Sequence, residues 1–150
     1  MWKQIFKTTL IAGSLDIIAA CTQAWLAQGT KPEIVLKYIA SAVFGKDAFS
    51  GGTGMILSGL LFHFIIAFAC TLVYFLLYPK IKLLRWNIFF SSLLIAVIAW
   101  TVTTRLIIPL SQIKQPPFDL TKALIAVSIL YVCIGLPVSY FAKRFYSVQK

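Results

Sequence analysis

The chain contains little charge and few of the side chains on which enzymes depend. Only 12% of its 150 residues are charged, and four of these are acidic, whereas about one quarter of a typical soluble domain is charged. This composition nearly excludes a water-soluble fold. The three cysteines, Cys21, Cys70 and Cys133, form no C-x-x-C pair, so a thiol oxidoreductase is not expected. A metal site, which needs a full set of convergent ligands, is not expected either.

The chain also lacks a recognisable catalytic motif. A Ser-His-Asp hydrolase would use Asp16 and His63, but no serine stands in the context of a nucleophile elbow. The segment Gly51-Gly52-Thr53-Gly54 is rich in glycine, yet no strand is expected before it and no P-loop lysine follows it. We therefore expect no catalytic residues and no cofactor, and a membrane-embedded enzyme is the least favoured interpretation.

Long apolar runs dominate the rest of the sequence. Hydrophobic residues make up 60% of the chain, and the mean hydropathy is +0.89. A helix needs roughly 20 residues to cross a hydrocarbon core of ~30 Å. Runs of about this length extend approximately over Thr8 to Gln28, Met55 to Tyr78, Trp86 to Pro109 and Lys122 to Phe141. They predict an all-α fold, a single integral-membrane four-helix bundle over residues 1–150, with a kink at Pro137.

Basic residues are concentrated at the ends of these runs. One set of termini and loops contains eight basic residues and no acidic one, namely Lys3, Lys7, Lys80, Lys82, Arg85, Lys143, Arg144 and Lys150. The other set mixes five basic with three acidic residues, namely Lys31, Lys37, Lys46, Lys114, Lys122, Glu33, Asp47 and Asp119. The positive-inside rule then predicts that both termini lie in the cytoplasm. The net charge of +10 is interpreted as contact with lipid headgroups, not with nucleic acid.

The first run has a second interpretation as a cleaved signal. Lys3 and Lys7 precede an apolar stretch that ends in Ala19-Ala20-Cys21, loosely like a lipoprotein signal. Asp16 fits the apolar part of a signal poorly, and the apolar character continues to Leu26. We therefore expect a first helix that is retained.

The long loop between the first two runs contains a helical pattern. Pro32 and Glu33 are typical of a helix start, and apolar residues then recur at helical spacing opposite Lys37 and Ser41. We expect a short amphipathic helix over approximately residues 32–44 that lies on the outer membrane surface or caps the bundle. In this arrangement Lys37 points toward water and Ile39 toward apolar surroundings.

Three ionisable side chains, Asp16, His63 and Arg105, lie inside the apolar runs. Counted from the outer surface at ~1.5 Å per residue, Arg105 lies at roughly 6 Å, His63 at roughly 13 Å and Asp16 at roughly 17 Å. This gradation suits a proton or anion path. It equally suits an Arg105 that reaches the headgroups and an Asp16 that pairs with His63 to hold helices together. In both cases we expect Asp16 and His63 to be neighbours, bonded directly or through one water.

The second half of the chain contains a series of short motifs. These are Gly59-Leu60-Leu61-Phe62-His63, Pro79-Lys80-Ile81-Lys82-Leu83, Pro109 and Pro116-Pro117-Phe118-Asp119-Leu120, followed by a last helix with a basic end. In these motifs the chain resembles the YagU-like family of small bacterial inner-membrane proteins. It implies a four-helix inner-membrane protein without an established biochemical activity, loosely associated with acid tolerance.

Two hypotheses about function follow. The first is a non-enzymatic membrane protein that serves in envelope homeostasis or stress tolerance, or as an accessory subunit of a membrane protein partner. The alternative is a small oligomeric transporter or channel for protons or anions that uses Asp16, His63 and Arg105. Because four short helices rarely enclose a solute path alone, a homo-oligomer would favour the second.

Overall fold

The computed structural model describes residues 1–110, 112 and 117–148, and the regular structure of these residues is entirely helical. Four helical segments are long and apolar enough to cross a membrane: Trp2–Gln28 (α1), Thr53–Leu77 (α4), Ile88–Leu110 and Leu120–Val148. The third span consists of α6 (Ile88–Val102), the π-helical η1 (Thr103–Ile107) and α7 (Ile108–Leu110). The fourth consists of α8 (Leu120–Leu130), the π-helical η2 (Tyr131–Gly135) and α9 (Leu136–Val148). The expected all-α four-helix bundle is confirmed.

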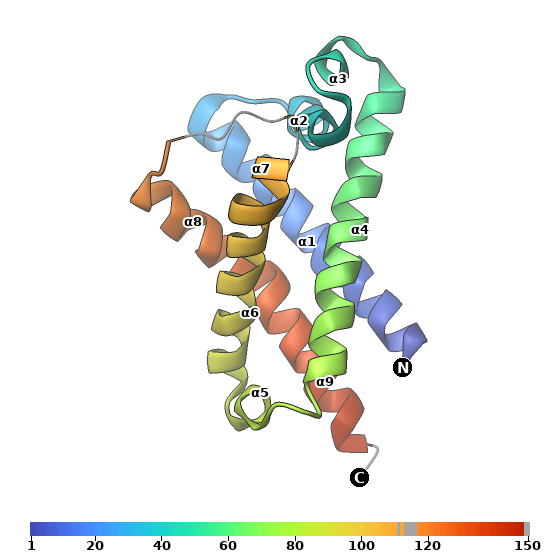
Figure 1. The fold of residues 1–150 in the computed structure, drawn as a ribbon, viewed down its shortest axis with the longest axis vertical. Coiled ribbons are helices and arrows are strands. Elements are labelled where there is room, and N and C mark those ends of the chain that lie inside the picture. Colours follow the sequence, from blue (N-terminus) through green and yellow to red (C-terminus); the bar gives the residue numbers. More distant parts are fainter. Residues whose placement is uncertain (111, 113–116, 149–150) are drawn as a thin grey trace.

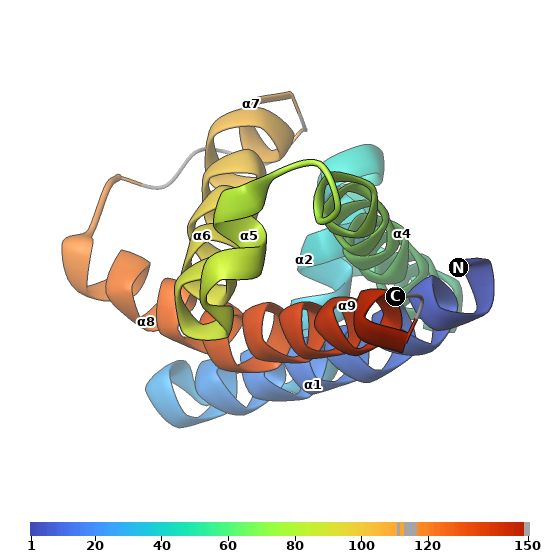
Figure 2. The same cartoon turned by 90° about the horizontal axis from the view of Figure 1, so that it is seen from below.

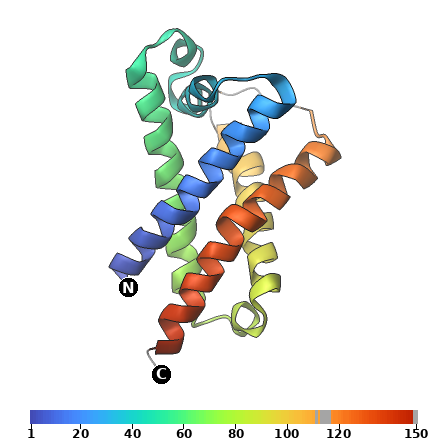
Figure 3. The ribbon, with the colours of Figure 1, turned by 180° about the vertical axis from the view of Figure 1, so that it is seen from behind.

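The spans form two layers (Figures 1 and 2). In one layer α1 and the fourth span lie side by side and run in opposite directions, as Figure 3 also shows. In the other layer α4 packs on α1, and α6 packs on the fourth span. The start of α1, the end of α9 and the short α5 (Lys82–Trp86) lie at one end, which we call the inner end. At the opposite, outer end lie α2 (Pro32–Phe44) and α3 (Asp47–Ser50).

Two spans are longer than the sequence analysis predicted. α1 begins at Trp2 instead of Thr8, and α9 ends at Val148 instead of Phe141. Hydropathy indicates only the part of a helix that lies in the hydrocarbon core of the bilayer. The helix itself continues into the headgroup region, because lysine is a good helix former. α1 has 27 residues. At ~1.5 Å per residue it is about 40 Å long, which exceeds a ~30 Å core and accounts for its oblique course.

The helix expected in the first loop is present as α2, which packs across the outer end of α4. Gly59 of α4 permits this close approach, because a Cβ at position 59 would overlap the backbone carbonyl of Leu36. Gln112 attaches α2 to the end of the third span. Its backbone N–H donates to the Ala42 carbonyl at 3.2 Å, and its Nε2 donates to the Val43 carbonyl at 2.6 Å. α2 is therefore a fixed cap on the bundle.

The prediction that Ser41 of α2 faces water is wrong. Ser41, which we expected to face water, is 4% exposed, and Lys37 is half-buried with its Nζ donating to the Phe49 carbonyl at 3.4 Å. Tyr38 and Val43 are instead exposed. Small side chains allow the backbones of α2 and α4 to touch, and close packing decided which face turns inward. Burial of the Ser41 hydroxyl costs little, because it donates to the Tyr38 carbonyl at 2.6 Å.

Both π-helical segments end two residues before a proline. The N–H of Ile108 donates to Thr103 before Pro109, and the N–H of Leu136 donates to Tyr131 before Pro137. A proline has no N–H, and its ring collides with the carbonyl four residues earlier in an α-helix. A wider π turn relieves that collision. The kink expected at Pro137 therefore takes the form of a π turn at η2.

Candidate functional site

The site begins where α1 and α4 come closest. Gly13 of α1 is buried, and a Cβ at this position would lie 2.8 Å from the Phe64 ring and 3.4 Å from the Ala67 Cβ of α4. A larger residue at this position would therefore force the Phe64 ring to move. His63 stands one residue before Phe64 and reaches across this contact to α1.

His63 donates a hydrogen bond from Nε2 to the Gly13 carbonyl, at 2.8 Å. Because a carbonyl only accepts, this bond assigns the ring proton of a neutral imidazole to Nε2. Nδ1 is then the nitrogen to which a further proton would bind. The bond joins two spans inside the bundle, and a bond of this kind is a recognised stabiliser of helix pairs in membranes.

Asp16 lies close enough to His63 for the two side chains to interact electrostatically. The predicted neighbourhood is therefore present, but the imidazole bonds to the backbone of Gly13 instead of to the carboxylate. The ion pair that the described residues form within 4.0 Å is Lys122 with Asp119. The helix crossing explains why His63 bonds to Gly13 and not to Asp16. It brings the Gly13 carbonyl nearer to the imidazole than the Asp16 side chain, which is almost one turn further along α1.

Two cysteines lie near this pair. The thiols of Cys70 in α4 and Cys133 in η2 are both within electrostatic range of Asp16. Ionisable groups from two other spans therefore lie near Asp16, and one of these spans is wound as a π-helix at this point. No three of the His, Cys, Asp and Glu side chains that the structure describes are arranged to hold a metal ion.

Buried hydroxyl groups continue the polar interior toward the inner end. The Tyr74 hydroxyl donates to Ser139 Oγ at 2.9 Å, and Ser91 Oγ donates to the same oxygen at 3.5 Å, which connects α4, α6 and α9. About one turn inward of Gly13, the hydroxyls of Thr8 and Thr9 are buried without a partner among the described residues. Sequence reasoning missed this network, although the pairs Thr8-Thr9 and Ser91-Ser92 stand out within apolar runs.

Arg105 does not belong to the group. It is exposed in η1 and makes no hydrogen bond or ion pair with Asp16 or His63. The third span packs mainly against the fourth, not against α4, and this separates Arg105 from the pair. The predicted sequence of Arg105, His63 and Asp16 along one path is therefore not assembled within a single copy.

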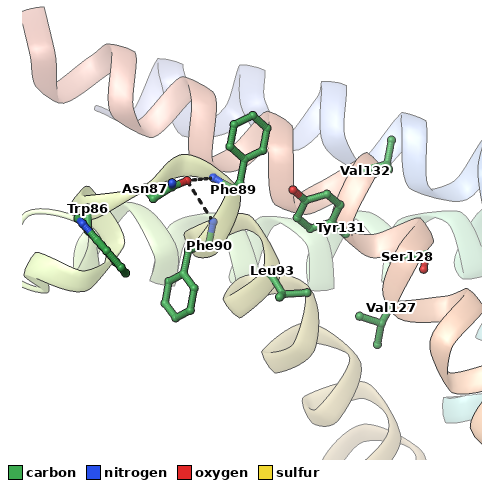
Figure 4. Close-up of a pocket in the computed structure, with 9 residues that line it drawn as sticks. All are labelled: Trp86, Asn87, Phe89, Phe90, Leu93, Val127, Ser128, Tyr131 and Val132. Carbon is green, nitrogen blue, oxygen red and sulfur yellow. Dashed lines mark hydrogen bonds between the residues drawn. The ribbon is translucent and has the colours of Figure 1, made fainter.

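The largest of the grooves that the structure shows lies elsewhere, between α6 and the fourth span. Figure 4 draws this groove, which has a volume of about 640 Å³. A smaller one, of about 420 Å³, lies between the inner ends of α1 and α9. Neither is lined by Asp16 or His63.

The fold and this interior define a small multi-pass helical membrane protein. The chain matches no protein-family model, no curated protein and no solved structure. The resemblance to the YagU-like family therefore stays a prediction, and a function has to be argued from the geometry.

Proposed function

We propose that the chain is a non-enzymatic protein of the bacterial inner membrane that serves in envelope homeostasis or as an accessory subunit. In this proposal Asp16 and His63 stabilise the bundle instead of conducting a solute. One observation carries it: His63 donates its hydrogen bond to the Gly13 carbonyl at a close contact between α1 and α4, where such a bond stabilises the helix pair. The acid tolerance associated with the YagU-like family is compatible with such a role.

The distribution of charge supports cytoplasmic termini. The inner end contains α5, the start of α1 and the end of α9, and the basic residues of its described part have no acidic counterpart. Glu33, Asp47 and Asp119 belong to the outer end. Since short loops rich in lysine and arginine remain on the cytoplasmic side, we infer that the inner end faces the cytoplasm.

The alternative, a proton path, rests on a different observation. Toward the inner end from Asp16 and His63 lie two buried threonine hydroxyls without a partner among the described residues, and the Tyr74, Ser139 and Ser91 network. Chains of hydroxyl groups can relay protons when water joins them. Anion conduction is less well supported, because Arg105 is apart from the pair.

Proteoliposomes containing the purified chain and an internal pH-sensitive dye distinguish the two functions. An imposed pH gradient should decay at the rate of empty liposomes if the interior is structural. A faster decay that Asp16→Asn abolishes, in a variant that remains folded, would contradict the proposal and establish the proton path. Arg105→Gln serves as the matched control, because it removes an exposed intramembrane charge that lies outside the polar interior.

The role in the envelope is tested in a strain that lacks the gene. The wild-type chain should restore survival under acid or envelope stress, and His63→Gln should restore it in proportion to the folded protein in the membrane. If a fully folded His63→Gln variant had no restoring effect, the imidazole would have a chemical function. That result would contradict the proposal that His63 only stabilises the bundle.

A further inference from the structure

The groove between α6 and the fourth span is apolar along most of its length. It is lined by Trp86, Asn87, Phe89, Phe90, Leu93, Val127, Ser128, Tyr131 and Val132. Figure 4 shows that Leu93 and Val127 approach from α6 and α8 at one part of the groove, while Trp86 and Phe90 stand toward its other end. Since α6 starts at the inner end, the groove runs from that end toward the middle of the bundle.

At its inner end the groove adjoins a cluster of positive charge. Trp86 also lines a second hollow, of about 600 Å³, together with Lys82, Leu83 and Arg85 of α5. The Trp86 ring is 77% exposed, and tryptophan at the end of a span favours the headgroup level of a bilayer. The shared tryptophan makes the basic hollow and the apolar groove two parts of one surface.

The positive charges of this surface have no acidic partner in the described part of the chain. The ion pair that the structure shows is Lys122 with Asp119, at the outer end, and the inner end has no acidic residue. The start of α6 does not supply the charge, because the Asn87 side chain already accepts from the N–H groups of Phe89 and Phe90. The attraction for an anion therefore comes from Lys82 and Arg85 themselves.

We propose that this surface binds one anionic phospholipid of the inner leaflet. The phosphate lies against Lys82 and Arg85, the glycerol region lies at Trp86, and one acyl chain occupies the groove between α6 and the fourth span. Charge complementarity selects the headgroup, since basic residues near the cytoplasmic surface of a bilayer attract anionic lipids. A helix from a second copy fits less well, because helix interfaces in membranes favour small residues and this groove is lined with large ones.

Fluorescence quenching by brominated lipids tests the proposal directly, because Trp86 stands at the predicted glycerol position. In a variant with Trp2, Trp25 and Trp100 replaced by phenylalanine, Trp86 is the remaining reporter. The reconstituted protein is titrated with brominated phosphatidylglycerol or brominated phosphatidylcholine that carry identical chains. The relative binding constant at Trp86 should favour the anionic lipid at least about fivefold, the factor that one basic residue near such a surface contributes.

Two pairs of variants locate the headgroup and the chain. Lys82→Gln with Arg85→Gln should bring the preference close to one, whereas Lys3→Gln with Lys143→Gln removes equal charge outside these hollows and should leave it unchanged. Ser128→Phe should fill the groove and weaken quenching by the brominated anionic lipid. Val73→Phe, at an exposed position of α4, adds similar bulk outside the groove and should not weaken quenching.

Three results would overturn the assignment. Equal quenching by both lipids would contradict the proposed headgroup site. The same conclusion would follow if the Lys3 and Lys143 control lost as much preference for the anionic lipid as the Lys82 and Arg85 variant. Absence of quenching by either lipid would mean that protein, such as a second copy of the chain, covers the groove. None of these results would bear on the proposed function, because the reconstituted protein can lack this site and remain a non-conducting membrane protein.

Discussion

Replacing Gly59 with alanine should detach α2 from the bundle. The new Cβ would overlap the carbonyl of Leu36, and that atom belongs to a helix backbone that is also held by Gln112 at its other end. Overpacking of this kind lowers the free energy of unfolding by about 1–3 kcal/mol. The higher helix propensity of alanine raises it by about 1 kcal/mol relative to glycine. We therefore expect a net loss of up to about 2 kcal/mol in the free energy of unfolding.

Gly54→Ala is the matched control, because it makes the same substitution in the same helix. A Cβ at position 54 meets no atom within 4 Å, so the variant should range from unchanged to about 1 kcal/mol more stable. Unfolding of the three proteins in a titration with denaturing detergent measures the difference. If Gly59→Ala is as stable as Gly54→Ala, the close contact between α2 and α4 does not exist.

Labelling of a cysteine at position 41 reports the detachment itself. Ser41 is 4% exposed, so a Ser41→Cys variant without its native cysteines should resist a soluble thiol reagent. Adding Gly59→Ala should make that cysteine reactive, and adding Gly54→Ala should not. Rapid labelling without any glycine substitution would refute the inward orientation of Ser41.

Three further predictions concern orientation, the polar interior and the cap. A reporter that is active only after export should be inactive when fused to the C-terminus, and an active fusion would reverse the assigned orientation. His63→Leu should cost about 0.6–1.7 kcal/mol in a detergent titration, the value of one interhelical bond. Asp16→Leu combined with it should cost less than the sum of the single changes, and simple additivity would contradict their coupling. Gln112→Ala should cost about 1 kcal/mol by removing the side-chain bond to Val43, and unchanged stability would show that this bond contributes nothing.

The positions of the helices were largely predictable from the sequence. In hydrocarbon every backbone polar group needs an internal partner, so each long apolar run has to be a helix. The bounds of α2 follow from the same local chemistry, because Pro32 suits a first turn and Gly45 adopts a φ of 61° that favours glycine. Its inward face was not predictable, since amphipathic periodicity assumes water on one side.

The grouping of the polar residues was predictable only in part. Asp16 and His63 each lie inside an apolar run, where an ionisable group needs a partner, and this argument correctly placed the two side chains near each other. The partner of His63 is a backbone carbonyl, and a sequence pattern does not distinguish one backbone carbonyl from another. The proximity of Cys70 and Cys133 to Asp16 was not predictable for a related reason, because it depends on how three spans cross.

The sequence by itself determined the number of spans, the expected sidedness and the presence of a cap helix, because these depend on local hydropathy, charge and turn chemistry. The tertiary structure alone decided which span packs on which, and hence that Arg105 stands apart while Asp16 and His63 meet. The physical reason is that lipid and protein interior are similarly apolar. Hydropathy therefore does not tell a lipid-facing side chain from a buried one, and the close contacts at Gly13 and Gly59 make that choice.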